Sequence, residues 1–151
     1  MLAVLLSVLG PALFHFPSAP QVHTAEARAA TALYRDLNRE RSSYGIPPLS
    51  LDGRLGTAAV SHVLDMIRNR YFSHETPSGE TPFDRFTAAG CIYRFAGENI
   101  AMAPDEQLAD WAIFGSAPHR RNILNPHYAR VGIAAAYDAR GQLFFVEDFS
   151  D

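Results

Sequence analysis

The sequence contains no lysine, a single cysteine and no apolar run of the roughly 20 residues that a membrane span needs. Its 13 basic residues are all arginines scattered along the chain, so the basic face that nucleic acid binding requires is missing. Cys91 has no partner for an internal disulfide, which leaves a hydrophobic core to stabilise the fold. With 151 residues, 48% of them hydrophobic and 19% charged, the chain suits one globular domain and is neither disordered nor fibrous.

The amino-terminal residues differ from the rest of the chain. Leu2–Leu9 is almost wholly apolar, and no charged side chain precedes Glu26. This length is typical of a secretory h-region of about 7–15 apolar residues, although the usual basic n-region is missing. Ala25–Ala27 offers a small-x-small cleavage motif. We therefore expect a signal peptide or apolar lead-in over 1–25 and a domain over 26–151, secreted or held in the cell envelope. The alternative is an apolar segment that packs on the domain.

Helical and strand patterns alternate through the remaining residues. Apolar periodicity predicts helices over 25–44 and from Asp52 to about Ile67. Shorter helices are expected after three further start signals, at Thr81, Pro104 and Ser116. Two strands, 131–137 and 142–149, are joined by a turn at 138–141 and predict a hairpin.

The two strands also indicate how the layers pack. Gly132, Ala134 and Ala136 leave one strand face with small side chains, so another element can approach it closely. Leu143–Val146 is apolar on both faces, as in a strand covered on both sides. The expected fold is an α/β protein, a three-layer α/β/α sandwich with a small, largely antiparallel sheet.

Three polar residues are the first candidates for a functional site. His74 and His119 each stand where a helix meets a loop, and Glu98 lies between them, flanked by Gly97 and Asn99. Two imidazoles and a carboxylate suit a divalent metal such as Zn²⁺, with water in the fourth position. Their spacing matches no compact metal motif, so the residues alone leave the site open.

Other reactive or aromatic residues have simpler interpretations. His62 lies in the apolar stripe of a helix and is expected to be a hydrogen-bonded core histidine, and His127 is expected at the surface. Ser116 could be a nucleophile, but a helix cap explains it better. Cys91 fits a small buried apolar residue better than a reactive thiol. Trp111 is expected in the core.

An ordered set of motifs resembles the CAP superfamily, whose SCP domain is shared by cysteine-rich secretory, antigen-five and pathogenesis-related-one proteins. The resemblance runs from residue 37 to residue 149 and is closest to the small secreted bacterial members. The motifs that carry it are Leu37-Asn38-x-x-Arg41-x-x-x-Gly45, Pro48-Leu49, Asp52-x-x-Leu55, Ala59-x-x-His62-x-x-Asp65-Met66, Tyr71-Phe72-Ser73-His74, Gly79, Arg85, Gly90, Gly97-Glu98-Asn99-Ile100, Trp111, Ser116-x-x-His119-Arg120, Asn122-Ile123-Leu124-Asn125-Pro126, Gly132 and Asp148-Phe149.

The resemblance implies an α/β/α sandwich with a cavity that can hold zinc. His74, Glu98 and His119 match the family residues that line it. The second acid of many members falls here on Phe114, so the acidic pair is incomplete. Glu75 and Glu147 are other possible oxygen donors, and nothing in the sequence selects either.

Two functional hypotheses follow. The first is a secreted binding module, a monomer, whose His/Glu-lined cleft accepts an apolar, lipid-like or peptide ligand, as attributed to relatives. The second is a metal-dependent hydrolase of the peptidase type, in which a metal-bound water attacks and Glu98 is the general base. A Glu98 that ligates the metal is not free to act as that base, so binding is preferred and the question of catalysis stays open. Under both hypotheses, we expect that the protein does not bind nucleic acid.

Overall fold

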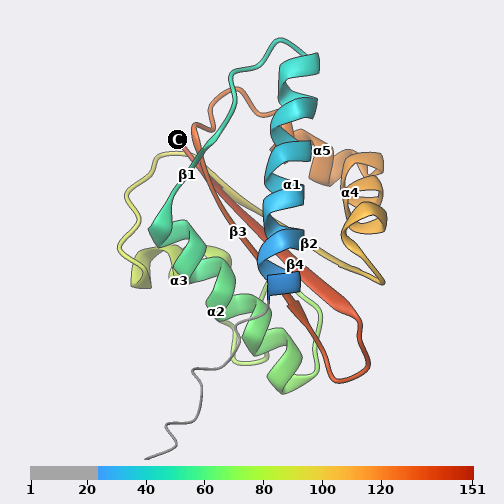
Figure 1. Cartoon of the computed structure of the whole chain (residues 1–151). Helices are drawn as coiled ribbons and strands as arrows, with labels where there is room; N and C mark the ends of the chain where they lie inside the picture. The colour runs from blue at the N-terminus through green and yellow to red at the C-terminus, as the bar shows by residue number, and fades with distance from the viewer. Residues whose placement is uncertain (1–23) are drawn as a thin grey trace, which may run out of the picture.

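The computed structural model describes residues 24–151, and nearly all of the expected leader lies outside the described residues. Nine elements follow one another in this part of the chain (Figure 1). They are α1 (Thr24–Ser43), β1 (Ser50–Leu51), α2 (Gly53–Asn69), α3 (Pro82–Ala88), β2 (Ala96–Ala103), α4 (Glu106–Gly115), α5 (Ala117–Ile123), β3 (Arg130–Tyr137) and β4 (Leu143–Ser150).

The four strands form one sheet in the order β1-β3-β4-β2. β4 pairs antiparallel with both β3 and β2, while the short β1 pairs parallel with β3. The predicted hairpin and the largely antiparallel sheet are therefore confirmed. β2 was not predicted as a strand, although it carries Glu98 and forms one edge of the sheet.

Helices cover both faces of the sheet, which confirms the three-layer sandwich (Figure 1). Phe145 of β4 shares a buried cluster with Leu37 of α1 and Ile113 of α4. On the opposite face, Val146 shares a cluster with Val63 of α2. Successive residues of β4 thus enter different cores, as expected for a strand covered on both sides.

The close approach that the small strand residues allow occurs at Gly132. A Cβ atom there would lie 2.2 Å from the backbone nitrogen of Gly56 in α2. The first turn of α2 therefore packs directly on β3, and its later turns extend over the same face of the sheet. This packing places His62 above the sheet face that carries Glu98.

The predicted helix starts are confirmed. Asp52 accepts hydrogen bonds from the backbone of Arg54 at 2.8 Å and Leu55 at 3.1 Å, and Thr81 and Asp84 form a reciprocal capping box. The prediction for Trp111 was wrong. It lies on α4, but its side chain faces solvent and is 75% exposed, because Ala109 and Ile113 form the buried face of that short helix.

None of the helices between residues 24 and 151 has both the length and the apolar character to cross a membrane.

Candidate functional site

Glu98 is the centre of a buried cluster of charged side chains. Its Oε1 accepts a hydrogen bond from His74 Nδ1 at 2.7 Å, and its Oε2 accepts from His62 Nδ1 and from Arg85 Nη2, each at 2.8 Å. The three donors come from α2, from the loop after α2 and from α3. The carboxylate thus ties two helices and a loop to strand β2.

The members of the cluster differ sharply in exposure. The side chains of Glu98, His62 and Arg85 are 1%, 0% and 3% exposed, whereas that of His74 is 48% exposed. Arg85 Nη2 also donates to the backbone oxygen of His74 at 2.9 Å, which fixes the loop from a second side. His74 is therefore the point at which the buried cluster reaches solvent.

Two opposing effects set the pKa of Glu98. Burial disfavours the charged form, but hydrogen bonds from His62 and His74 and the charge of Arg85 outweigh it and lower the pKa to about 2. An ionised carboxylate only accepts hydrogen bonds, so both Nδ1 atoms donate. His62 Nε2 also lies 3.0 Å from the carbonyl oxygen of Ser73, which is a further acceptor.

Asp148 adds a second carboxyl group beside this cluster. It is the cross-strand partner of Glu98 in the β2–β4 register, so both side chains project from the same face of the sheet. Asp148 is fully buried, and neither of its carboxyl oxygens has a hydrogen-bond partner. Burial and then the negative charge of Glu98 raise its pKa well above the ordinary range. Two neighbouring carboxyl groups on this face therefore have pKa values shifted in opposite directions.

His119 lies on α5 and approaches the cluster from another direction. Its buried Nδ1 has no hydrogen-bond partner, while its backbone oxygen accepts from Asn99 Nδ2 at 3.2 Å. Burial lowers the pKa of His119, and its electrostatic interaction with His74 lowers it further. Of the three predicted site residues, His74 and Glu98 are in direct contact. Among residues 24–151, the His119 side chain makes no hydrogen bond to either of them.

The other oxygen donors named from the sequence are not part of this cluster. Glu147 projects from the opposite face of the sheet, where its Oε2 accepts from Asn99 Nδ2 at 3.0 Å. Burial raises the pKa of Glu147 to about 7, against the lowering effect of the Asn99 hydrogen bond. Glu75 is exposed to solvent.

The structure also explains the other reactive residues that were considered from the sequence. Ser116 stands at the N-cap of α5, as predicted, but its side chain makes no capping hydrogen bond. Cys91 is partly buried, and burial raises the pKa of its thiol, which disfavours the reactive thiolate. His127 lies at the surface, as predicted, and its ring stacks on Phe95 at 4.6 Å between centroids.

The ability of these residues to hold a metal is limited by Glu98. Both of its oxygens are already hydrogen-bonded, and within residues 24–151 no three His, Cys, Asp or Glu side chains are grouped so that they could hold a metal ion. His74 and His119 would supply two protein ligands, whereas a typical catalytic zinc site has three. Glu98 instead resembles the carboxylate that orients a ligating histidine through its second nitrogen.

Comparison with known proteins agrees with this architecture. The model of the cysteine-rich secretory protein family, CAP, matches residues 34–149. The chain belongs to the CAP family. Its CAP domain is 38% identical over 99 residues to the uncharacterized protein YkwD of Bacillus subtilis (strain 168). That match covers 64% of this chain and 38% of the relative, so the chain spans less than half of the relative's length.

Solved structures show the same fold. An extracellular protein containing an SCP domain from Bacillus anthracis superposes on the CAP domain with a TM-score of 0.76 and 31% identity, covering 83% of this chain and 41% of that one. An outer surface protein of Borrelia burgdorferi has a TM-score of 0.77 at 19% identity, covering 82% of this chain and 92% of that one. The latter likeness supports the fold alone.

Zinc has been seen in a more distant structure with the CAP fold. NaASP2 was crystallised with Zn²⁺, and it matches this chain at 14% identity with a TM-score of 0.60. The match covers 84% of this chain and 82% of that one. At this identity the likeness extends to the fold and not to the ligands of the metal.

Sequence reasoning missed how the cluster is held together. His62 is the buried, hydrogen-bonded core histidine that was predicted, yet its partner is Glu98, which was assigned to the metal site. Arg85 belonged to the family motifs but received no role. Two features of the sequence could have indicated these roles. One is a histidine in the apolar stripe of a helix, and the other is an arginine one turn after a helix start. Both are buried polar side chains that need a charged or hydrogen-bonding partner.

Proposed function

We propose that this CAP domain is an extracellular binding module rather than a hydrolase. The observation that carries the proposal is the hydrogen bonding of Glu98 by His62, His74 and Arg85. A carboxylate with a pKa near 2 and both oxygens engaged is a poor general base, since an effective base titrates close to the working pH. Glu98 serves as an anchor that positions His74 at the surface.

The location and domain limits extend the predictions from the sequence. We propose that residues 1–25 form the leader, that 26–151 form the CAP domain, and that the mature protein is a secreted or envelope-held monomer. The extracellular description of the Bacillus anthracis relative supports this location. The Ala25–Ala27 motif lies in the first turn of α1, so amino-terminal sequencing of exported protein would show whether cleavage occurs before or within that helix.

The surroundings of the cluster favour a peptide ligand over an alkyl chain. A pocket of about 700 Å³ lies between α2 and the loop after it, and His62 and Arg85 reach its wall. Most of its other lining residues are polar; they include Ser61, Asp65, Asn69, Thr76, Ser78 and Glu80. Hydroxyl, amide and carboxylate groups of this kind hydrogen-bond to a peptide, whereas an alkyl chain would leave them unpaired.

Weak zinc binding is the finer part of the proposal. In the neutral form of His74, Nδ1 donates to Glu98 and leaves the Nε2 lone pair free to bind a metal on a ring that is about half exposed. The unpaired Nδ1 of His119 offers a second nitrogen. Two imidazoles without a third protein ligand predict an affinity well below the roughly 10–16 kcal/mol of structural zinc sites.

The first experiment separates binding from hydrolysis. Purified protein is titrated with ZnCl₂ by calorimetry and assayed for cleavage of fluorescein-labelled casein, with and without the metal. We expect weak zinc binding that His74→Ala and His119→Ala abolish, and no cleavage. His127→Ala, an exposed histidine outside the cluster, is the matched control and should bind as the wild type does. Cleavage that requires zinc and disappears in His74→Ala would overturn the binding proposal.

The second experiment tests the peptide ligand directly. A random peptide library is selected on wild-type protein, and the selected peptides are measured against Ser61→Arg, which fills the polar pocket from the exposed side of α2. Loss of affinity in Ser61→Arg, with His127→Ala unchanged, supports the pocket. Peptides that bind Ser61→Arg as well as the wild type, or a library that yields no binder, contradict it.

A further inference from the structure

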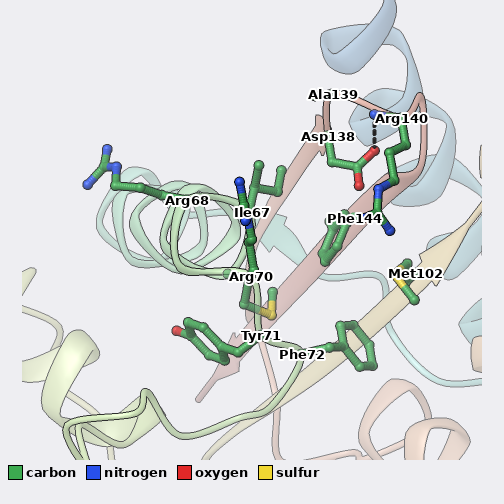
Figure 2. Close-up of a pocket in the computed structure, with 11 residues that line it drawn as sticks. Ile67, Arg68, Arg70, Tyr71, Phe72, Met102, Asp138, Ala139, Arg140 and Phe144 are labelled. Atoms are coloured by element: carbon green, nitrogen blue, oxygen red, sulfur yellow. Dashed lines mark hydrogen bonds between the residues drawn. The ribbon is translucent and has the colours of Figure 1, made fainter.

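A second pocket, drawn in Figure 2, lies on the same sheet face. Its lining residues include none of the Glu98 cluster. It has a volume of about 580 Å³ and lies between the end of α2, strand β2 and the turn that joins β3 to β4. A volume in this range suits a small molecule.

The wall of the pocket is apolar and in part exposed. Phe72 and Met102 are 45% and 49% exposed, although both are large apolar side chains. Phe72 meets the ring of Phe144 edge-on at 6.1 Å, and Met66 and Tyr71 complete this surface. An apolar concave surface of this kind is buried favourably by an alkyl or aromatic group.

Three arginines line this pocket without partners of their own. Within residues 24–151, the guanidinium groups of Arg68, Arg70 and Arg140 take part in no ion pair and no hydrogen bond. Some other arginines of residues 24–151, such as the exposed Arg35 and Arg121, are likewise unpaired. The buried ones are not: Arg41 donates to four backbone oxygens, and Arg85 is bound to Glu98. The pocket therefore combines an apolar surface with uncompensated positive charge.

The backbone holds two of these arginines at the rim. Arg70 caps α2 in the left-handed conformation, with φ 58° and ψ 47°, and its backbone N–H donates to Met66. Residues other than glycine are uncommon in that conformation. Arg140 stands in a turn where Asp138 Oδ1 accepts from its backbone N–H at 2.8 Å. In Figure 2, Phe144 lies between the side chains of Arg70 and Arg140, and Arg68 points away.

The charge pattern limits the kind of ligand. The lining contains three arginines and one acid, Asp138, whose Oδ1 is held by two backbone N–H groups of the turn. A formal net charge of −3 for the chain disfavours a large polyanion. A small ligand with one anionic head and an apolar body matches both the cations and the surface between them.

We infer that this pocket binds an amphiphilic anion, that is, an alkyl or aryl chain that ends in a carboxylate or a phosphate. The head pairs with Arg70 and Arg140, and the apolar chain packs on Phe72, Met102 and Phe144. Guanidinium groups suit both head groups because they hydrogen-bond to carboxylate and phosphate oxygens in the same planar geometry.

Calorimetry with defined probes tests the inference. Decanoate, decyl phosphate and the uncharged decyl glucoside are titrated as monomers, each below its micelle-forming concentration. The variants are Arg70→Gly, which keeps the left-handed backbone available, Arg140→Gln and the double variant. Arg35→Gln, an exposed arginine on α1, is the matched control. Phe72→Ser tests the apolar wall, and circular dichroism checks that each variant folds.

We expect both anionic probes to bind and the double variant to lose about ten-fold or more in affinity for them, as for lost charge-assisted hydrogen bonds. Decyl glucoside should bind weakly and equally to the wild type and the arginine variants. Phe72→Ser should lower the affinity for all three probes. Arg35→Gln should leave all three affinities unchanged.

Three results would overturn the inference. The first is that the anionic probes fail to bind, or bind the folded double variant as tightly as the wild type. The second is that inorganic phosphate binds as tightly as decyl phosphate, which would exclude a role for the apolar wall. The third is binding to anionic phospholipid vesicles without binding to the monomeric probes, which would assign this surface to a membrane and not to a soluble amphiphile.

Discussion

The buried acid Glu147 should make the stability of this CAP domain depend on pH. Its carboxyl group is enclosed between β2 and β4 and the helices of the α1 side, and its one hydrogen bond is from Asn99. Burial raises its pKa from an ordinary 4.5 to about 7. Between these values the folded protein binds more protons than the unfolded chain. The free energy of unfolding therefore falls as the pH rises through this window.

The size of the effect follows from the pKa rise. At about 1.4 kcal/mol per pKa unit, the shift corresponds to a loss of about 3 kcal/mol by pH 7 and above. Glu147→Gln removes the titrating group and keeps a side-chain oxygen that can accept from Asn99. We expect the variant to match the wild type near pH 4 and to be more stable by up to about 3 kcal/mol at pH 8.

Urea denaturation followed by circular dichroism, from pH 4 to pH 8, measures this difference. Asp148 and Glu98 are present in both proteins, so most of their contribution cancels when the variant is compared with the wild type. What remains is the effect of the Glu147 charge on the pKa of Asp148. Glu75→Gln, at an exposed position, is the control and should follow the wild type at every pH. A stability difference between Glu147→Gln and the wild type that does not change with pH would refute the reasoning.

Three further substitutions test the packing around the site by urea denaturation at pH 7. Gly132→Ala should destabilise by about 3 kcal/mol, because its Cβ would lie 2.2 Å from the backbone of α2; wild-type stability would disprove that contact. Arg85→Gln should cost about 3–5 kcal/mol by leaving Glu98 without its buried cation, and a loss below about 1 kcal/mol would contradict this. Thr81→Ala should cost only about 1 kcal/mol through the lost capping box, with the site unaffected; no change would argue against the box.

The helices, the hairpin and the layer order could be predicted from the sequence because each rests on a local pattern. Asp52 and Thr81 are caps whose partners lie within three residues, and the apolar period of α2 extends over several turns. The small residues of β3 indicated the close approach of α2 for a steric reason that the structure confirms. β2 escaped prediction because Gly97, Glu98 and Asn99 open it with residues that are depleted in strands.

The site was only partly predictable because its contacts join distant parts of the chain. His74 and Glu98 were singled out, and they touch. The role of Glu98 depends on His62 and Arg85, which are 36 and 13 residues away from it in sequence. Whether a carboxylate is a ligand, a base or an anchor depends on how many donors surround it, and spacing in the sequence does not encode that number. The prediction for Trp111 was wrong because α4 carries apolar residues on its exposed side as well, among them Leu108, so its sequence does not show which face is buried.

The central claim is that Glu98 is an ionised anchor, and its own titration tests this most directly. Carbon-13 NMR of protein labelled at the glutamate carboxyl carbons, with Glu98→Gln to assign the resonance, follows this group as the pH is lowered. We expect an apparent pKa of about 2, so the resonance should stay that of the charged form through neutral and mildly acidic pH. A titration midpoint at about 6–7, the range of a tuned catalytic glutamate, would show that Glu98 is not such an anchor.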